Sequence, residues 1–208
     1  MVDALSEEYF EARKADIKKR VSEKRFAHVC DVAQCAKELA HTYGVDEQKA
    51  HLAGILHDWD KNYDDEEIRE RVKELNMDVD QFVLKTLARV LHAHTAAVAL
   101  GREFPEIPKD VLQAIDRHTI AATDMTDLDM VVYCADALEP GRQFGRVDEI
   151  RDKIGKVELE ELFLSVYEYW VELMLERRCV VHPITLEVWN HYAARWREKK
   201  GILEWKKM

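Results

Sequence analysis

Residues 54–61 read Gly-Ile-Leu-His-Asp-Trp-Asp-Lys, and the pair His57-Asp58 follows a run of small and apolar residues. The apolar residues predict a buried segment, where an imidazole and a carboxylate are costly unless a cation or another partner compensates them. This stretch therefore predicts a metal site inside a hydrophobic core, with further ligands supplied by other parts of the chain.

The length and composition predict one helix-rich domain. A chain of 208 residues can bury a substantial core, whereas two full domains would be cramped. The chain is 47% hydrophobic and 35% charged, with 7 Gly and 4 Pro, as expected for a helical globule. We expect a single domain over residues 1–208, with a core at about 20–155 and C-terminal helices of 156–208 packed on it.

The charge and the cysteines argue against several functional classes. A formal net charge of -10 disfavours binding to nucleic acid or to an anionic membrane. The N-terminus is acidic rather than basic and apolar, and no apolar stretch approaches the ~20 residues of a membrane span. The cysteines form no C-x-x-C pair or disulfide-like framework, so we expect a cytoplasmic protein. They are Cys30, Cys35, Cys134 and Cys179.

Apolar residues recur at helical spacing along most of the chain, and no strand pattern is present. We expect Ser22 and Asp46 to cap helices, Gly44 to end one, and the acidic run 64–67 to open a surface helix. The expected helices cover about residues 6–20, 22–43, 46–57, 80–100, 109–118, 128–139 and 159–176, with a terminal helix that carries Trp189, Trp196 and Trp205. The predicted fold is an all-α bundle.

Imidazoles and carboxylates recur on the apolar sides of five of these helices. One histidine on an apolar face is usually a hydrogen-bonded core residue, but each buried polar group without a partner costs ~1–3 kcal/mol. A whole set therefore predicts metal binding. The candidate metal ligands are His28, His57, Asp58, His92, His118 and Asp136.

The ligand types indicate which metals are suitable. Imidazole and carboxylate without thiolate favour a divalent transition metal, namely Fe, Mn, Co, Ni or Zn. Six protein ligands exceed the needs of one catalytic ion, whereas two ions bridged by a carboxylate would use them all. Asp58, next to His57, is the candidate bridge.

The order of these motifs resembles the HD-domain superfamily of metal-dependent phosphohydrolases. The resemblance is closest to the YqeK-like bacterial HD proteins, which are symmetrical bis(5'-nucleosyl)-tetraphosphatases, and it spans about residues 20 to 192. The motifs that carry it are Lys24-Arg25-Phe26-Ala27-His28-Val29, Tyr43-Gly44-Val45-Asp46, Ala53-Gly54-Ile55-Leu56-His57-Asp58 with Lys61, Leu91-His92-Ala93, His118-Thr119, the segment 133–142 that ends Ala-Asp-Ala-Leu-Glu-Pro-Gly-Arg, and His182-Pro183 with Thr185, Leu186 and Asn190.

The resemblance implies an HD-domain helical bundle with a di-iron or similar dinuclear centre in its core. It places His28, His57, Asp58 and Asp136 around one ion, and Asp58, His92 and His118 around the other. It also implies hydrolysis of diadenosine tetraphosphate into two molecules of ADP. The chain departs from the family pattern at Asp60, at His94 and in the turn 120–123, which replaces a Gly-containing turn.

Three cationic side chains are candidates for contacts with phosphate. We expect Lys61 and Arg142 to bind phosphate oxygens and, together with Asp58, to act in catalysis. Arg25 is a further candidate for substrate binding. The alternatives are a solvated lysine for Lys61 and a salt bridge for Arg25. Two other histidines are expected outside the ligand set: His94 on the surface, and His182 capping or packing against the terminal helix.

Other functions remain open at this point. An HD phosphohydrolase acting on another nucleotide fits the same residues, and so does a di-iron HD-fold oxygenase with the same ligands. Lys61 and Arg142 favour phosphate over dioxygen chemistry. A silent nucleotide-binding module and a metal-free helical scaffold are less specific alternatives. Nothing in the sequence decides between a monomer and a homodimer.

Overall fold

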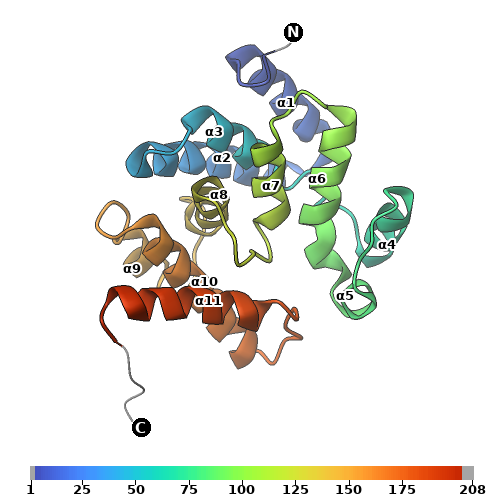
Figure 1. Ribbon diagram of the computed structural model, residues 1–208. Helices are drawn as coiled ribbons and strands as arrows, with labels where there is room; N and C mark the ends of the chain where they lie inside the picture. The colour runs from blue at the N-terminus through green and yellow to red at the C-terminus, as the bar shows by residue number, and fades with distance from the viewer. Residues whose placement is uncertain (1–2, 203–208) are drawn as a thin grey trace.

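The computed structural model describes residues 3–202, and all its regular elements there are helical (Figure 1). This confirms the predicted all-α class. The elements are α1 (Glu7–Arg20), α2 (Glu23–Tyr43), α3 (Glu47–Leu56), α4 (Asp65–Glu74), α5 (Gln81–Thr86), the 3-10 helix η1 (Ala88–Leu91), α6 (His92–Glu103), α7 (Lys109–Arg117), α8 (Asp127–Leu138), α9 (Val147–Arg151), α10 (Leu159–Glu176) and α11 (Thr185–Lys199).

The residues predicted to cap or end helices do so in the structure. The Ser22 side chain accepts a hydrogen bond from the third residue of α2, and Gly44 ends that helix with φ 72°. Asp46 caps α3 through two backbone N–H groups. Asp64 forms a capping box with Glu67, which confirms the acidic run as the start of a helix. These caps satisfy N–H and C=O groups that helix ends would otherwise leave unpaired.

The segment 80–100 is not the continuous helical stretch that its periodicity suggested. It forms α5, η1 and α6, with a break at Leu87, whose φ of -135° is not helical. The two halves bury their apolar sides in different places: Val83 and Leu91 pack in a small cluster with α4, whereas Ala96 and Leu100 pack in the main core. A single straight helix could not direct one apolar face toward both clusters.

Two further points differ from the expectation or lie beyond the described residues. The short helix α9 was not predicted; its five residues are too few to show a helical period. Trp189 and Trp196 of α11 pack against the main core, whereas Trp205 lies outside the described residues. Among residues 3–202, no helix is both long and apolar enough to cross a membrane.

The centre of the molecule is formed by α2, α3, α7 and α8, which pack on one another. In Figure 1, α1 lies over α2 and α3, α4 and α5 project to one side beyond α6, and α9, α10 and α11 lie on the other side of α8. One cluster of buried apolar side chains runs from Phe10 of α1 to Tyr192 of α11. A shared core of this kind supports one domain, and the boundary near residue 155 stays a prediction.

Helices α2 and α3 approach each other closely at Gly54 of α3. A Cβ atom at this position would lie 2.7 Å from Cα of Ala33 and 3.1 Å from the carbonyl oxygen of Val32. The backbones of α2 and α3 are therefore in direct contact. This contact sets the spacing between His28 on α2 and His57 at the end of α3.

Candidate metal centre

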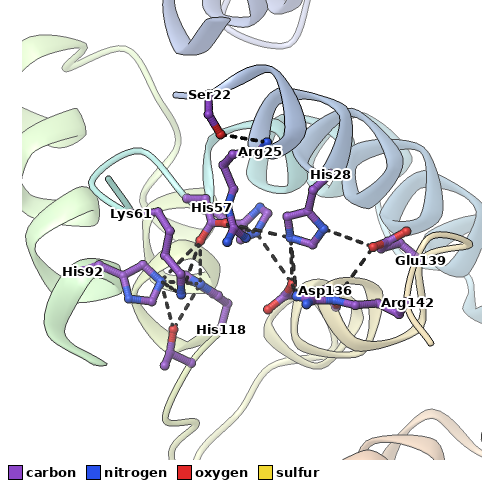
Figure 2. Close-up of polar contacts among 12 residues, drawn as sticks. Ser22, Arg25, His28, His57, Lys61, His92, His118, Asp136, Glu139 and Arg142 are labelled. Atoms are coloured by element: carbon purple, nitrogen blue, oxygen red, sulfur yellow. Dashed lines mark hydrogen bonds and ion pairs between the residues drawn. The ribbon is translucent and has the colours of Figure 1, made fainter. Parts of the chain in front are cut away.

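The six candidate ligands come from five parts of the chain and lie close together. Figure 2 shows five of them, namely His28, His57, His92, His118 and Asp136. His57 is the C-cap of α3, and Asp58 lies in the turn that follows rather than on a continued helix. The others are His28 on α2, His92 at the start of α6, His118 at the C-cap of α7 and Asp136 on α8.

Three of the four imidazoles are oriented in the same way. In His57, His92 and His118, Nδ1 lies 2.7, 2.8 and 2.7 Å from the carbonyl oxygen three residues earlier in the chain. A carbonyl oxygen accepts only, so the proton of each ring is on Nδ1 and Nε2 presents a lone pair. Metal-binding histidines are commonly held by such a hydrogen bond from the other ring nitrogen.

His28 is held by a carboxylate instead. Its Nδ1 lies 3.1 Å from Oε1 of Glu139, a residue that is 3% exposed. The other carboxylate oxygen of Glu139 accepts a short hydrogen bond from the backbone N–H of Gly141. Sequence reasoning did not assign Glu139 a role, although it stands three residues after Asp136 in the same motif. Its contact with His28 joins residues 111 apart in the chain.

The first group of ligand atoms surrounds one side of Asp58. Nε2 of His28 lies 3.1 Å and Nε2 of His57 lies 3.9 Å from Oδ1 of Asp136. The same two nitrogens lie 3.8 and 3.4 Å from Oδ2 of Asp58. His28, His57 and Asp136 therefore present their ligand atoms to a common point.

The second group surrounds the other oxygen of Asp58. Oδ1 lies 3.3 Å from Nε2 of His92 and 3.9 Å from Nε2 of His118. The two imidazole nitrogens are 3.2 Å apart. Asp58 thus directs one oxygen to each group, which is the arrangement a bridging carboxylate requires.

These donor atoms fit divalent metal ions. Nε2 of His57 is buried and has no hydrogen-bond partner among the described residues. The Nε2 atoms of His92 and His118 face each other at 3.2 Å, so both rings direct a nitrogen toward the same small region. A metal ion would give the unpaired Nε2 of His57 a partner, and imidazole nitrogen with carboxylate oxygen suits a transition metal of the Fe, Mn, Co, Ni or Zn class.

The protonation states of His92 and His118 agree with this fit, whereas at His57 burial lowers the pKa but Asp58 and Asp136 outweigh it and raise that pKa. Burial lowers the pKa of His92, and burial together with the neighbouring imidazoles lowers that of His118 well below its usual value. Both rings are therefore neutral near pH 7, as ligation requires. Burial alone would raise the pKa values of Asp58 and Asp136, but the adjacent imidazoles and cations outweigh it and hold both pKa values well below the usual range.

Lys61 and Arg142 lie at the edge of the ligand groups. Nζ of Lys61 is 3.2 Å from Nε2 of His92, and Nη2 of Arg142 is 2.5 Å from Oδ1 of Asp136. The Nε–H of Arg142 also donates to the carbonyl oxygen of Asp136, at 2.8 Å. Both side chains are about one third exposed and line the adjacent cavity. They are within reach of a ligand that contacts the metal groups.

Arg25 is placed differently from these two cations. Its Nη1 lies 2.9 Å from Oδ2 of Asp58, and the residue does not line the cavity. The structure thus contains the salt bridge that was the alternative for Arg25. A contact between Arg25 and substrate stays a prediction.

A cavity of about 360 Å³ opens beside the ligand groups. Its polar part includes Lys61, Thr119 and Arg142 together with the ligands His118 and Asp136. Many of its other lining residues are apolar or aromatic, and they include Tyr167, Trp170 and Met174 of α10 as well as Leu87 and Val90. Sequence reasoning did not predict this wall, because nothing in the period of α10 shows which helix it faces.

Thr119 is a second residue without an earlier assignment. Its Oγ1 lies 3.1 Å from Nε2 of His118 and 3.4 Å from Nε2 of His92. The hydroxyl is therefore at the second ligand group and also lines the cavity. Its position directly after His118 was the only sequence signal.

The departures from the family pattern have structural explanations. Asp60 is 1% exposed and is paired with Arg20 at 3.2 Å and Arg71 at 3.3 Å, so its charge is compensated. It ties the turn that carries His57 and Asp58 to α1 and α4. In the turn after His118, Ala121 has φ 65°, so the backbone keeps a conformation that favours glycine.

The remaining histidines lie outside the ligand groups. Nδ1 of His94 is 2.5 Å from Asp116, and its side chain is 30% exposed, so it is only partly at the surface. His182 accepts a hydrogen bond from the Ile184 N–H at the start of α11, and it also lines the cavity. His41, His51 and His191 are in other parts of the molecule.

A hollow of about 530 Å³ also lies between the start of α10 and α11. Its charged side chains are largely paired with one another: Lys199 lies 2.9 Å from Glu158, and Lys200 lies 3.0 Å from Glu161. It contains no group of potential metal ligands. The chemistry is therefore centred on the smaller cavity.

Comparison with known proteins agrees with this geometry. A family model described as HD domain matches residues 25–141. The chain is 33% identical to the symmetrical bis(5'-nucleosyl)-tetraphosphatase of Halalkalibacterium halodurans, over 84% of this chain and 91% of that protein. It is 31% identical to the protein of the same name from Bacillus subtilis, over 85% and 93%.

A solved structure is similar over nearly the whole chain. It is that of a predicted HD superfamily hydrolase involved in NAD metabolism from Clostridium acetobutylicum, with a TM-score of 0.82 and 28% identity, covering 89% of this chain and 97% of that one. The segment matched by the family model contains all six candidate ligands. The chain belongs to the HD domain family, whose members depend on divalent metal ions.

Proposed function

We propose that this protein is a metal-dependent phosphohydrolase that cleaves diadenosine tetraphosphate symmetrically into two molecules of ADP. The observation that carries the proposal is the pair of ligand groups sharing Asp58, beside a cavity that also exposes Lys61 and Arg142. The relatives named symmetrical bis(5'-nucleosyl)-tetraphosphatase support the choice of substrate. Cationic side chains and metal ligands at one cavity suit the negative charge of a polyphosphate chain.

The proposed metal ligands are His28, His57, Asp58 and Asp136 for one ion, and Asp58, His92 and His118 for the other. Imidazole nitrogen and carboxylate oxygen suit iron, and Mn, Co, Ni and Zn use the same donors. When bound, such ions supply Lewis acidity toward water and the phosphoryl group. We propose iron as the resident metal, in a dinuclear centre.

The chain's own residues position the substrate. Lys61 offers a compact ammonium to a phosphate oxygen, and Arg142 offers a planar guanidinium that can bind two oxygens. Arg142 is oriented by its contact with the carbonyl oxygen of Asp136, and Lys61 lies beside the second ligand group, with Nζ 3.2 Å from Nε2 of His92. Asp58 acts in catalysis by fixing the two ligand groups relative to each other, with one carboxylate oxygen near each. We also propose that Arg25 contacts the substrate, exchanging its salt bridge with Asp58 for that contact.

The apolar side of the cavity suits an adenine base. Trp170 and Tyr167 provide aromatic faces, and Met174 adds a polarizable side chain. Bases stack on aromatic side chains with ~1–3 kcal/mol per base. A phosphate chain near Lys61 and a nucleoside near α10 therefore use both parts of the same cavity.

The test is product analysis on protein of defined metal content. Diadenosine tetraphosphate, other dinucleoside polyphosphates and mononucleotides are each incubated with the protein, and the products are separated by ion-exchange chromatography. Two ADP from one diadenosine tetraphosphate are expected. AMP with ATP would contradict symmetrical cleavage, and faster hydrolysis of another nucleotide would contradict the choice of substrate.

The oxygenase alternative, the location and the oligomeric state each need a separate test. Lys61 and Arg142 favour a phosphate ester over the oxygenase alternative, and an oxygen electrode during turnover tests this directly. A cytoplasmic location, the absence of nucleic-acid binding and the question of a homodimer all stay predictions. Size-exclusion chromatography with light scattering decides the oligomeric state.

A further inference from the structure

His182 lies in the segment 177–184, which connects α10 with α11, and it borders two hollows at once. It lines the cavity beside the metal groups, and it also lines a neighbouring hollow of about 310 Å³ together with His94 and Asp116. The segment is anchored nearby: the Tyr167 hydroxyl donates to the carbonyl oxygen of Thr185 at 3.2 Å. The imidazole of His182 is therefore held at the cavity wall.

One ring nitrogen of His182 is already engaged. The backbone N–H of Ile184 donates to Nδ1 at 3.3 Å. A nitrogen that accepts a hydrogen bond carries no proton, so the proton of the neutral ring is on Nε2. Burial lowers the pKa of His182, which keeps the ring neutral. Pro183 further restricts the backbone of the preceding His182.

The second ring nitrogen is free to serve a ligand. No hydrogen bond joins Nε2 of His182 to another group within residues 3–202. His94, which lines the neighbouring hollow with His182, is paired with Asp116 at 2.5 Å. The Nε2–H of His182 is thus a neutral donor, with a fixed tautomer, in a residue that lines the same cavity as Lys61 and Arg142.

We propose that His182 binds the substrate by donating a hydrogen bond from Nε2 to an oxygen of the phosphate chain. The inference rests on the proposed function and adds a residue of the segment between α10 and α11 to the cationic Lys61 and Arg142. It assigns the segment 177–184 a part in substrate binding as well as in connecting two helices. His182 is not a metal ligand, so metal content does not depend on it.

Three substitutions separate this role from the capping of α11. His182→Asn keeps an acceptor near the position of Nδ1 for the Ile184 N–H but cannot reach as far as Nε2. His182→Gln places its amide N–H near the position of Nε2. His182→Ala lacks both groups. His41→Ala is the control, because His41 is 79% exposed and contacts Glu47 at the surface.

The measurements are kcat and KM for diadenosine tetraphosphate, together with the Kd of ADP and of inorganic pyrophosphate, the metal content and the Tm. A hydrogen bond to a charged group predicts a rise in KM of about 10-fold or more for His182→Ala and His182→Asn, with metal content unchanged. His182→Gln should recover most of this loss. His182→Asn should keep the wild-type Tm, and His41→Ala should match the wild type throughout.

Two results would overturn the inference. A wild-type KM in His182→Asn would show that capping is the whole role of His182. A loss of affinity for ADP without a loss for pyrophosphate would place the donor on the nucleoside rather than on the phosphate chain. Failure of the wild-type protein to form two ADP would instead refute the proposed function, so the two failures are distinguishable.

Discussion

The contact between α2 and α3 at Gly54 predicts a specific effect of adding one methyl group. In Gly54→Ala the new Cβ would lie 2.7 Å from Cα of Ala33, whereas ordinary carbon contacts are about 3.5–4.0 Å. The contacted atoms are backbone, so no side chain can rotate away. The helices must separate by roughly 1 Å.

The energetic consequence is the difference of two effects. Overpacking of this kind costs about 3 kcal/mol, while alanine is favoured over glycine inside a helix by about 1 kcal/mol. The free energy of unfolding should therefore fall by about 2 kcal/mol. For a chain of this size, that corresponds to a Tm about 4–8 °C lower.

The same displacement should weaken the metal centre. His28 is on α2 and His57 ends α3, so separation of the helices moves two ligands of one group apart. Metal sites tolerate deviations of about 0.2 Å in ligand distance. Metal content after dialysis and the rate of hydrolysis should both fall, as measured by elemental analysis and by release of ADP.

Gly101→Ala is the matched control. Gly101 is also inside a helix, α6, but its added Cβ would meet only the end of the Leu112 side chain, at 3.0 Å, which can rotate. Its Tm should equal or exceed that of the wild type. A Gly54→Ala protein with wild-type Tm and metal content would refute the close contact between α2 and α3.

Three further predictions follow from single residues. Asp58→Ala removes the carboxylate shared by both ligand groups, so metal content and hydrolysis should both be lost. The control Asp65→Ala, at an exposed residue, should keep both. Full metal content in Asp58→Ala would refute the shared site. Glu139→Gln weakens the acceptor for His28 and should lower metal affinity about 10–100-fold in a chelator competition, and unchanged affinity would argue against its orienting role. Ala121→Gly relieves a positive φ and should raise the Tm by about 1–4 °C, whereas the same change at its neighbour Ala122 should lower it; a lower Tm for both would contradict the strained turn.

The helices were predictable where their signals are local. The caps at Ser22, Asp46 and Asp64 and the left-handed Gly44 depend on residues within one turn, and each is found as expected. The break at Leu87 was not predictable, because the helical period continues across it. The chain bends there to bury its two halves in separate clusters, which depends on where α4 packs.

The candidate ligands were predictable as residue types on apolar faces, but their partners were not. A histidine and an aspartate at helical spacing indicate that a polar group points inward. They do not show that Glu139 meets His28, since the two are 111 residues apart in the chain. The contribution of α10 to the cavity wall was not predictable either, because Trp170 reaches the site only through the packing of α10 on α8.

The amino-acid sequence by itself determined the helical class, the helix ends and the kind of ligands at the centre, because these follow from spacing and residue chemistry within single segments. Only the tertiary structure decided that the two oxygens of Asp58 face two different groups, 3.4 Å from His57 and 3.3 Å from His92. It also decided that Arg25 pairs with Asp58 while Lys61 and Arg142 line the cavity. These relations depend on how distant helices pack, and the physical reason is the burial of charged groups, which must find partners across the core.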